Sequence, residues 1–131
     1  MNPVSLILLV CVLVDLILLA YVFWRRHTEP AHFAFAFLVL CLAAWHTANF
    51  LVSAANTPQV ANAAGRTAFT LAALVAYAYL VFTWFFPKTY HPKPGRLTFI
   101  AVSLCTLVVA ALCLTPLVQK SVVITEEGPK P

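Results

Sequence analysis

Four long apolar stretches constrain what this chain can fold into more than any other feature of its sequence. Each is 21 residues long, and they cover residues 4–24, 33–53, 66–86 and 97–117. A helix needs about 20 apolar residues to cross about 30 Å of hydrocarbon, so each stretch has the length of a membrane span. The sequence therefore predicts an all-α membrane protein with one membrane domain over residues 1–131, including an outer tail at 118–131.

The placement of charge supports lipid as the solvent of these stretches. Of the 131 residues, 63% are hydrophobic and only 12 are Lys, Arg, Asp or Glu. Inside the four stretches the only charged residues are Asp15 and Arg66. A soluble domain is about a quarter charged, and its surface helices repeat polar residues on one face. The sequence thus excludes a soluble domain, and the net charge of +4 requires no nucleic-acid partner.

The breaks between the stretches predict an antiparallel four-helix bundle with both termini outside. The breaks at 25–30 and 87–96 carry five Lys or Arg residues, against three on the opposite side. Lys and Arg collect on the cytoplasmic side of a membrane, so both of these breaks are expected in the cytoplasm. The break at 53–65, which contains Pro58 and Gly65, is expected outside, because proline and glycine interrupt helices.

Polar residues at similar depth predict a buried cluster of Asp15, His46 and Asn49. Asp15 lies near the centre of the first stretch, where an ionised carboxylate costs about 2.5–3.5 kcal/mol and needs a partner. His46 lies one turn outward of the centre of the second stretch, and Asn49 one turn further. The cluster is expected to act either as a structural hydrogen-bond clamp or as a site that senses a ligand or protons.

Histidines and cysteines provide little support for a cofactor or metal. His32 and His46 are fourteen residues apart, which places them within about 40° on one helix face. A ring nitrogen of either histidine could be the axial ligand of a haem or a pigment. Two haems would require matching histidines on a second helix. No cofactor is expected, and this axial role remains the alternative. No metal site is expected, because no C-x-x-C pair occurs among the cysteines Cys11, Cys41, Cys105 and Cys113.

Small residues four apart predict a helix-packing seam. They are Ala64, just before the third stretch, and Ala68, Ala72 and Ala76 within it, with Ala44 and Ala48 in the second. Small side chains let helix backbones approach closely in lipid. The seam serves either packing within the chain or binding of another protein. Arg66 is expected at the outer interface, where the third helix would begin, with its charge reaching the headgroups.

Several of these features resemble the N-terminal seven-helix membrane region of bacterial sensor histidine kinases. The residues that carry the resemblance are Trp45, Asn49-Phe50, Arg66, Phe69, Phe85-Phe86-Pro87 and Thr115-Pro116-Leu117-Val118. The resemblance covers roughly residues 5–129 and implies an outside N-terminus in the bacterial cytoplasmic membrane. That family continues with three more helices and a kinase, whereas this sequence ends after four stretches. Its three glycines form no nucleotide-binding loop.

Two functions follow from this combination. The first is a non-enzymatic accessory or structural subunit, built on half of a sensor module and packed against a larger membrane complex or in a homo-oligomer. The alternative is a sensory membrane domain, or a fragment of one, from a histidine-kinase-type signalling protein. No convergent set of nucleophile, base or metal ligands predicts an enzyme. The lipid bilayer is the expected partner in either case.

Overall fold

Four α-helices account for almost every residue that the structure describes. The computed structural model describes residues 3–24, 29–86 and 95–115. Its helices are α1 (Pro3–Trp24), α2 (Pro30–Ala54), α3 (Pro58–Phe85) and α4 (Arg96–Leu114). Each is long and apolar enough to cross a membrane, so the prediction of four spans in a multi-pass protein is confirmed. The tail at 118–131 lies outside the described residues.

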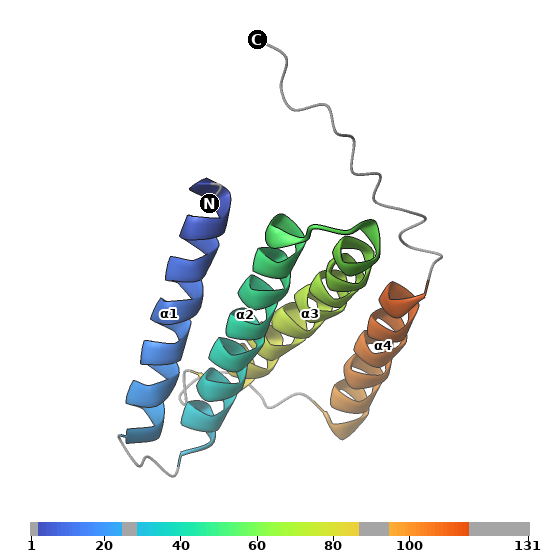
Figure 1. The fold of residues 1–131 in the computed structure, drawn as a ribbon. Coiled ribbons are helices and arrows are strands. Elements are labelled where there is room, and N and C mark those ends of the chain that lie inside the picture. Colours follow the sequence, from blue (N-terminus) through green and yellow to red (C-terminus); the bar gives the residue numbers. More distant parts are fainter. Residues whose placement is uncertain (1–2, 25–28, 87–94, 116–131) are drawn as a thin grey trace.

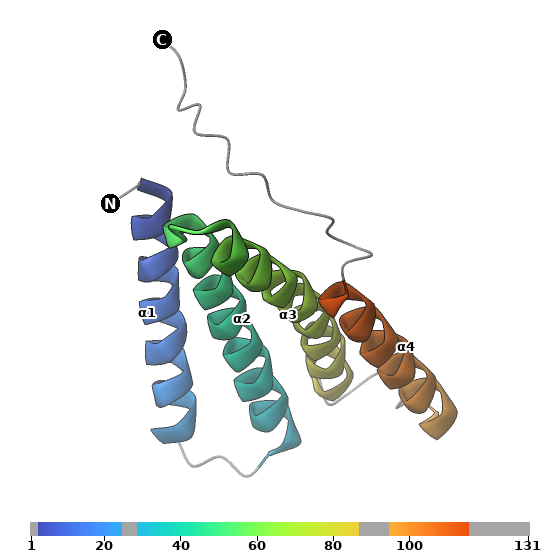
Figure 2. The ribbon, with the colours of Figure 1, turned by 45° about the vertical axis from the view of Figure 1, so that its right-hand side comes forward.

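The helices stand side by side in chain order, and neighbours run in opposite directions (Figure 1). Contacts join α1 to α2, α2 to α3 and α3 to α4, and no other pair of these described helices is in contact. Figure 2 shows the same order after a turn of 45°. The prediction of antiparallel neighbours is therefore confirmed, whereas a bundle around a shared interior is not formed. In lipid no hydrophobic effect drives the outer helices together.

The contact between α2 and α3 is the tightest part of the row. Its centre is formed by Leu38, Cys41 and Ala78, against which Leu42, Leu74, Val75 and Phe82 pack. Ala78 is 0% exposed, so its methyl group is completely enclosed. The rings of Phe35 and Phe82 lie 5.6 Å apart and extend this contact toward one end of the two helices. These side chains contain no hydrogen-bonding nitrogen or oxygen, so packing holds α2 against α3 at this centre.

The outer helices are instead attached to this centre by hydrogen bonds. Between α3 and α4, Tyr77 Oη lies 2.7 Å from Ser103 Oγ. Because Ser103 Oγ already donates to Phe99 O, the Tyr77 phenol is the donor. Thr70 Oγ1 also reaches Ala110 O at 3.4 Å. No residue within α4 is buried, so these polar contacts have little packing to support them.

Tyr77→Phe should therefore weaken the attachment of α4. Interhelical hydrogen bonds in membranes contribute about 0.6 kcal/mol on average and up to about 1.7 kcal/mol, and we expect a loss in that range. The matched control is Tyr79→Phe, since the Tyr79 side chain is exposed. The measurement is the free energy of unfolding in mixed micelles of a mild detergent and dodecyl sulfate. Equal losses for the two variants would show that the Tyr77–Ser103 bond does not stabilise the fold.

Two prolines begin helices earlier than the sequence pattern predicts. α2 begins at Pro30 rather than residue 33, and α3 begins at Pro58 rather than residue 66. Proline suits the first helical position, because its fixed φ is helical and its missing N–H would have no partner there. Thr57 Oγ1 also accepts a hydrogen bond from Val60 N at 3.4 Å and caps α3. The predicted break at 53–65 is therefore wrong, and residues 55–57 alone separate the two helices.

Proline also ends α4 earlier than predicted. The helix stops at Leu114 rather than at residue 117, and Thr115 is extended, with φ −83° and ψ 156°. Residue 116 is proline, and the residue before a proline is disfavoured in the helical conformation. Local backbone sterics at Thr115 thus keep this residue of the predicted fourth stretch out of the helix.

Candidate functional site

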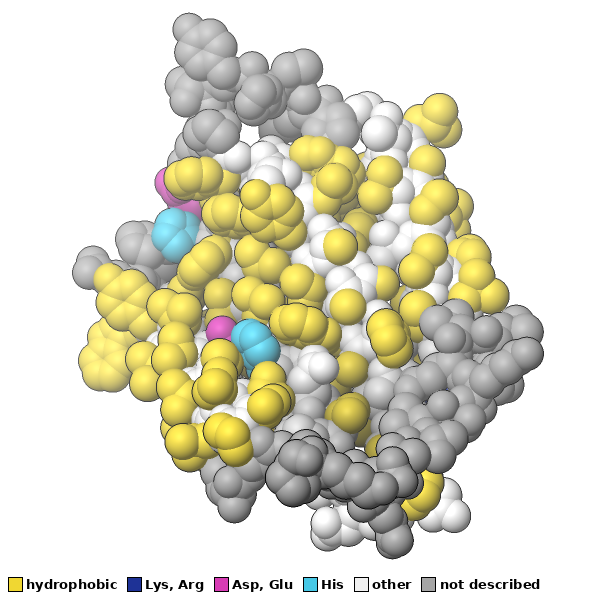
Figure 3. All heavy atoms as spheres, turned by 90° about the horizontal axis from the view of Figure 1, so that it is seen from above, with side chains coloured by type: hydrophobic (Ala, Val, Ile, Leu, Met, Phe, Trp, Pro, Cys, Tyr) yellow, Lys and Arg dark blue, Asp and Glu magenta, His cyan; other side chains and the backbone are white. Residues whose placement is uncertain are grey.

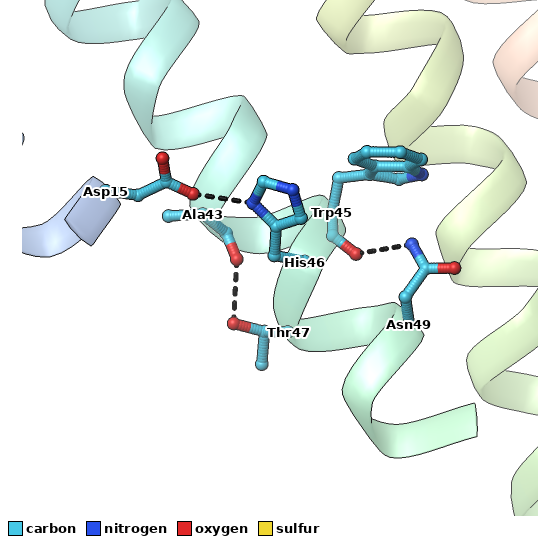
Figure 4. Close-up of polar contacts among 6 residues, drawn as sticks. All are labelled: Asp15, Ala43, Trp45, His46, Thr47 and Asn49. Carbon is cyan, nitrogen blue, oxygen red and sulfur yellow. Dashed lines mark hydrogen bonds and ion pairs between the residues drawn. The ribbon is translucent and has the colours of Figure 1, made fainter. Parts of the chain in front are cut away.

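Asp15 on α1 and His46 on α2 point toward one another at the contact between these two helices (Figure 4). His46 Nδ1 lies 2.7 Å from Asp15 Oδ2, and the two side chains are 19% and 11% exposed. Asp15 is within about two residues of the midpoint of α1, and His46 about four residues, or about 6 Å, from that of α2. A hydrocarbon layer of about 30 Å therefore encloses the pair.

The pattern of burial along α1 explains why this helix presents its carboxylate to α2. Ser5 and Asp15 are its only buried residues, whereas most of its leucines, isoleucines and valines are exposed. Ser5 Oγ lies 2.9 Å from Ser53 Oγ of α2, in a second polar contact nearer the start of α1. Lipid solvates leucine as well as another helix does, so small and polar side chains face the partner helix instead. α1 is thus attached through its few polar groups.

Asn49, which was expected in the same cluster, lies outside it. Its Nδ2 donates a hydrogen bond of 2.8 Å to Trp45 O in the preceding turn. Figure 4 shows its side chain on the side of α2 away from Asp15. Three residues beyond His46, a helical side chain is rotated by about 60° from it, and Asn can satisfy its amide on the backbone. The structure therefore brings together two of the three predicted residues.

Trp45 is the neighbour that the polar pattern did not identify. Its ring lies 5.2 Å from the His46 ring, with the planes tilted by 44°. In the sequence it contributed only to the family resemblance, although its position beside a membrane histidine was a visible signal. The site therefore combines a carboxylate, an imidazole and an indole. Figure 3 shows a face of the molecule on which acidic and histidine side chains interrupt a mostly hydrophobic surface.

The other predicted polar residues lie away from the pair. His32 is in the first turn of α2, fourteen residues from His46. Arg66 was expected to open the third helix, but it lies eight residues after Pro58, about 12 Å along α3. Its Nε is buried and makes no hydrogen bond among the described residues. The same described residues contain no group of three or more His, Cys, Asp or Glu side chains that could hold a metal ion.

Only some of the alanines in the predicted seam are buried. Ala48, Ala64 and Ala68 are buried, Ala44 and Ala72 are half-buried, and Ala76 is exposed. Four residues turn a helix by about 400°, so a strict four-residue repeat drifts by about 40° at each step. After three steps Ala76 has rotated by about 120° away from Ala64. The buried small residues of α3 instead follow a shorter spacing, through Ala61, Ala64, Gly65, Ala68 and Ala78.

The comparisons with known proteins agree with the helical architecture. Residues 7–130 match the family described as the N-terminal 7TM region of histidine kinase. That range includes all four described helices except the first residues of α1. No curated protein and no solved structure matches the chain.

Proposed function

Because the chain belongs to the family of N-terminal seven-transmembrane regions of histidine kinases, we propose that it is a sensory membrane domain, or part of one, of a histidine-kinase-type signalling protein. The match over residues 7–130 is the observation that carries this proposal. The comparisons give no support to the other predicted role, an accessory subunit of a larger complex. We propose no catalytic step for this chain, and we place it in a bacterial cytoplasmic membrane.

The Asp15–His46 pair is the element through which we propose that a signal acts. α1 contacts only α2 among the described helices, and two polar contacts attach it there. A signal that stabilises one arrangement of the pair over another shifts the packing of α1 by that difference in free energy. Change at a single buried polar contact would then alter the position of a whole helix. The tight α2–α3 contact would remain as the fixed part of the domain.

A phosphorylation experiment tests the signalling role. The tagged chain is purified gently from its native membrane and incubated with radiolabelled ATP. We expect acid-labile phosphohistidine on the same polypeptide or on a co-purifying kinase, and a changed level of label in Asp15→Asn and His46→Gln. Tyr79→Phe, at an exposed position, should leave the level unchanged. Stoichiometric co-purification with a complex that shows no such label would contradict the proposal.

We further propose that the N-terminus and the 55–57 loop lie outside the cell. The five-to-three excess of Lys and Arg in the breaks before α2 and α4 supports this orientation. Most of those basic residues, except Arg66 and Arg96, lie outside the described residues. Alkaline phosphatase inserted in the 55–57 loop should be active, and the same enzyme inserted just before Arg96 should be inactive. The reverse pattern of activity would invert the topology.

A further inference from the structure

One ring nitrogen of His46 is left without a hydrogen bond by the contact with Asp15. Nδ1 lies 2.7 Å from Asp15 Oδ2, and the ring makes no second hydrogen bond among the described residues. The side chain is 19% exposed, so the imidazole is not sealed between the two helices. A polar atom in an apolar environment is destabilising until it gains a partner. Nε2 is therefore a polar atom that lacks a hydrogen-bond partner among the described residues.

The charge balance of the pair decides whether Nε2 donates or accepts. Asp15 is the only Asp, Glu, Lys or Arg residue in α1 and α2, so no other charge on these helices compensates it. A carboxylate beside a neutral imidazole has a net charge of −1, and a carboxylic acid beside an imidazolium has a net charge of +1. Hydrocarbon disfavours both charged states relative to a neutral pair.

Two neutral forms of the pair share a proton along the Nδ1–Oδ2 contact, and both place a hydrogen on Nε2. The third neutral form, in which Nδ1–H donates to the carbonyl oxygen of the acid, leaves the acid O–H unpaired and is disfavoured in hydrocarbon. In the ionic form, carboxylate and imidazolium, both ring nitrogens carry hydrogen, and Nδ1–H donates to Asp15 Oδ2. In the uncharged form, the carboxylic acid donates to Nδ1, so the single ring hydrogen is on Nε2. Nε2 is an N–H donor in either form. Its complement is consequently a hydrogen-bond acceptor.

Resting on the function proposed above, we propose that His46 Nε2–H binds the carbonyl oxygen of a lipid-soluble ligand of the quinone or ketone class. The pair lies within about 6 Å of the helix midpoints, whereas the hydrocarbon layer extends about 15 Å to either side. The ester carbonyls of phospholipids lie at its edge, so they do not supply the acceptor. The ligand must carry its carbonyl into the hydrocarbon itself.

Two neighbours of His46 suit such a ligand. The Trp45 ring, 5.2 Å away, offers a flat apolar face beside the N–H, and aromatic faces stack on planar rings. The Asp15 carboxyl fixes the orientation of the imidazole through Nδ1, as a hydrogen-bonded second partner commonly does. Asp15 is thus a positioning residue, and His46 makes the contact with the ligand.

Quenching of Trp45 fluorescence by a decyl-substituted benzoquinone tests this binding directly. The chain carries Trp24→Phe and Trp84→Phe, so that Trp45 is its only tryptophan, and is held in lipid nanodiscs. We expect saturable quenching, with at least tenfold weaker binding after His46→Phe. His32→Phe is the matched control and should bind like the parent. Asp15→Asn should weaken binding less than His46→Phe does.

A measurement on the unsubstituted chain guards against a variant that fails to fold. With ¹⁵N-labelled histidine, the His46 Nε2–H resonance should move with the quinone and stay in place with decylbenzene, which has no carbonyl. Equal binding by the His46→Phe variant, an equal shift with decylbenzene, or rapid exchange of Nε2–H with water in the presence of quinone would overturn the proposal. If phosphohistidine labelling is found but quinone does not bind, only the proposed ligand is wrong. If quinone binds saturably but no labelling is found, only the proposed signalling role is wrong.

Discussion

His46→Leu is expected to lower the free energy of unfolding by about 3 kcal/mol, because it leaves the Asp15 carboxyl without a partner in hydrocarbon. That magnitude is the cost of placing an unpaired acidic side chain at the centre of a membrane helix. The native pair avoids this cost through the 2.7 Å contact between His46 Nδ1 and Asp15 Oδ2. The measurement is unfolding in mixed micelles, followed by a reporter on α1.

The double variant Asp15→Leu/His46→Leu separates a broken pair from lost packing. Replacing both partners of a buried ion pair with apolar residues is often neutral, so the double variant should recover most of the loss. Thr47→Leu is the matched single control on α2, since that side chain is exposed and bonds only to Ala43 O in its own helix. A double variant as unstable as His46→Leu would show that shape rather than polarity holds α1 to α2.

The Asp15–His46 contact could be predicted from the sequence because it depends on how deep each residue lies in the membrane. Each residue has a place along its own apolar stretch, and an antiparallel connection brings equal depths together. A lone carboxylate in lipid also requires a partner, and His46 is the basic side chain at a matching depth. Asn49 shows where this reasoning fails, because depth does not determine the direction in which a side chain points around its helix. Its own backbone supplied the acceptor for its amide.

The predictions of the helix boundaries and of the alanine seam were wrong for related reasons. Pro58 and Gly65 were interpreted as interruptions, but Pro58 is the first residue of α3 and Gly65 is buried inside it. Proline and glycine can interrupt a helix, but they also occur at its start or inside it, and hydropathy alone does not distinguish these cases. Ala76 has the four-residue spacing of the predicted seam, but the accumulated rotation of the helix carries it out of the contact between helices. Four apolar spans were predictable, because length and hydrophobicity alone decide them.

The centre of the α2–α3 contact makes the second large effect predictable, since the side chains that surround Ala78 there carry no nitrogen or oxygen. Ala78→Leu should lower the free energy of unfolding by about 1–3 kcal/mol, the usual cost of overpacking an enclosed site. Ala78 is 0% exposed and packs against Leu38 and Cys41, so a larger side chain must push α2 and α3 apart. Unfolding in mixed micelles measures the loss, and a cross-link between α2 and α3 reports the separation.

Ala76→Leu is the matched control for this substitution, two residues away on the same helix. Ala76 is exposed, so its larger replacement meets lipid, which accepts leucine without strain, and the free energy of unfolding should stay within about 0.5 kcal/mol. A large loss at Ala76 with none at Ala78 would mean that α3 is rotated about its axis relative to this structure. The predicted four-residue seam, rather than the shorter observed spacing, would then be the contact between the helices.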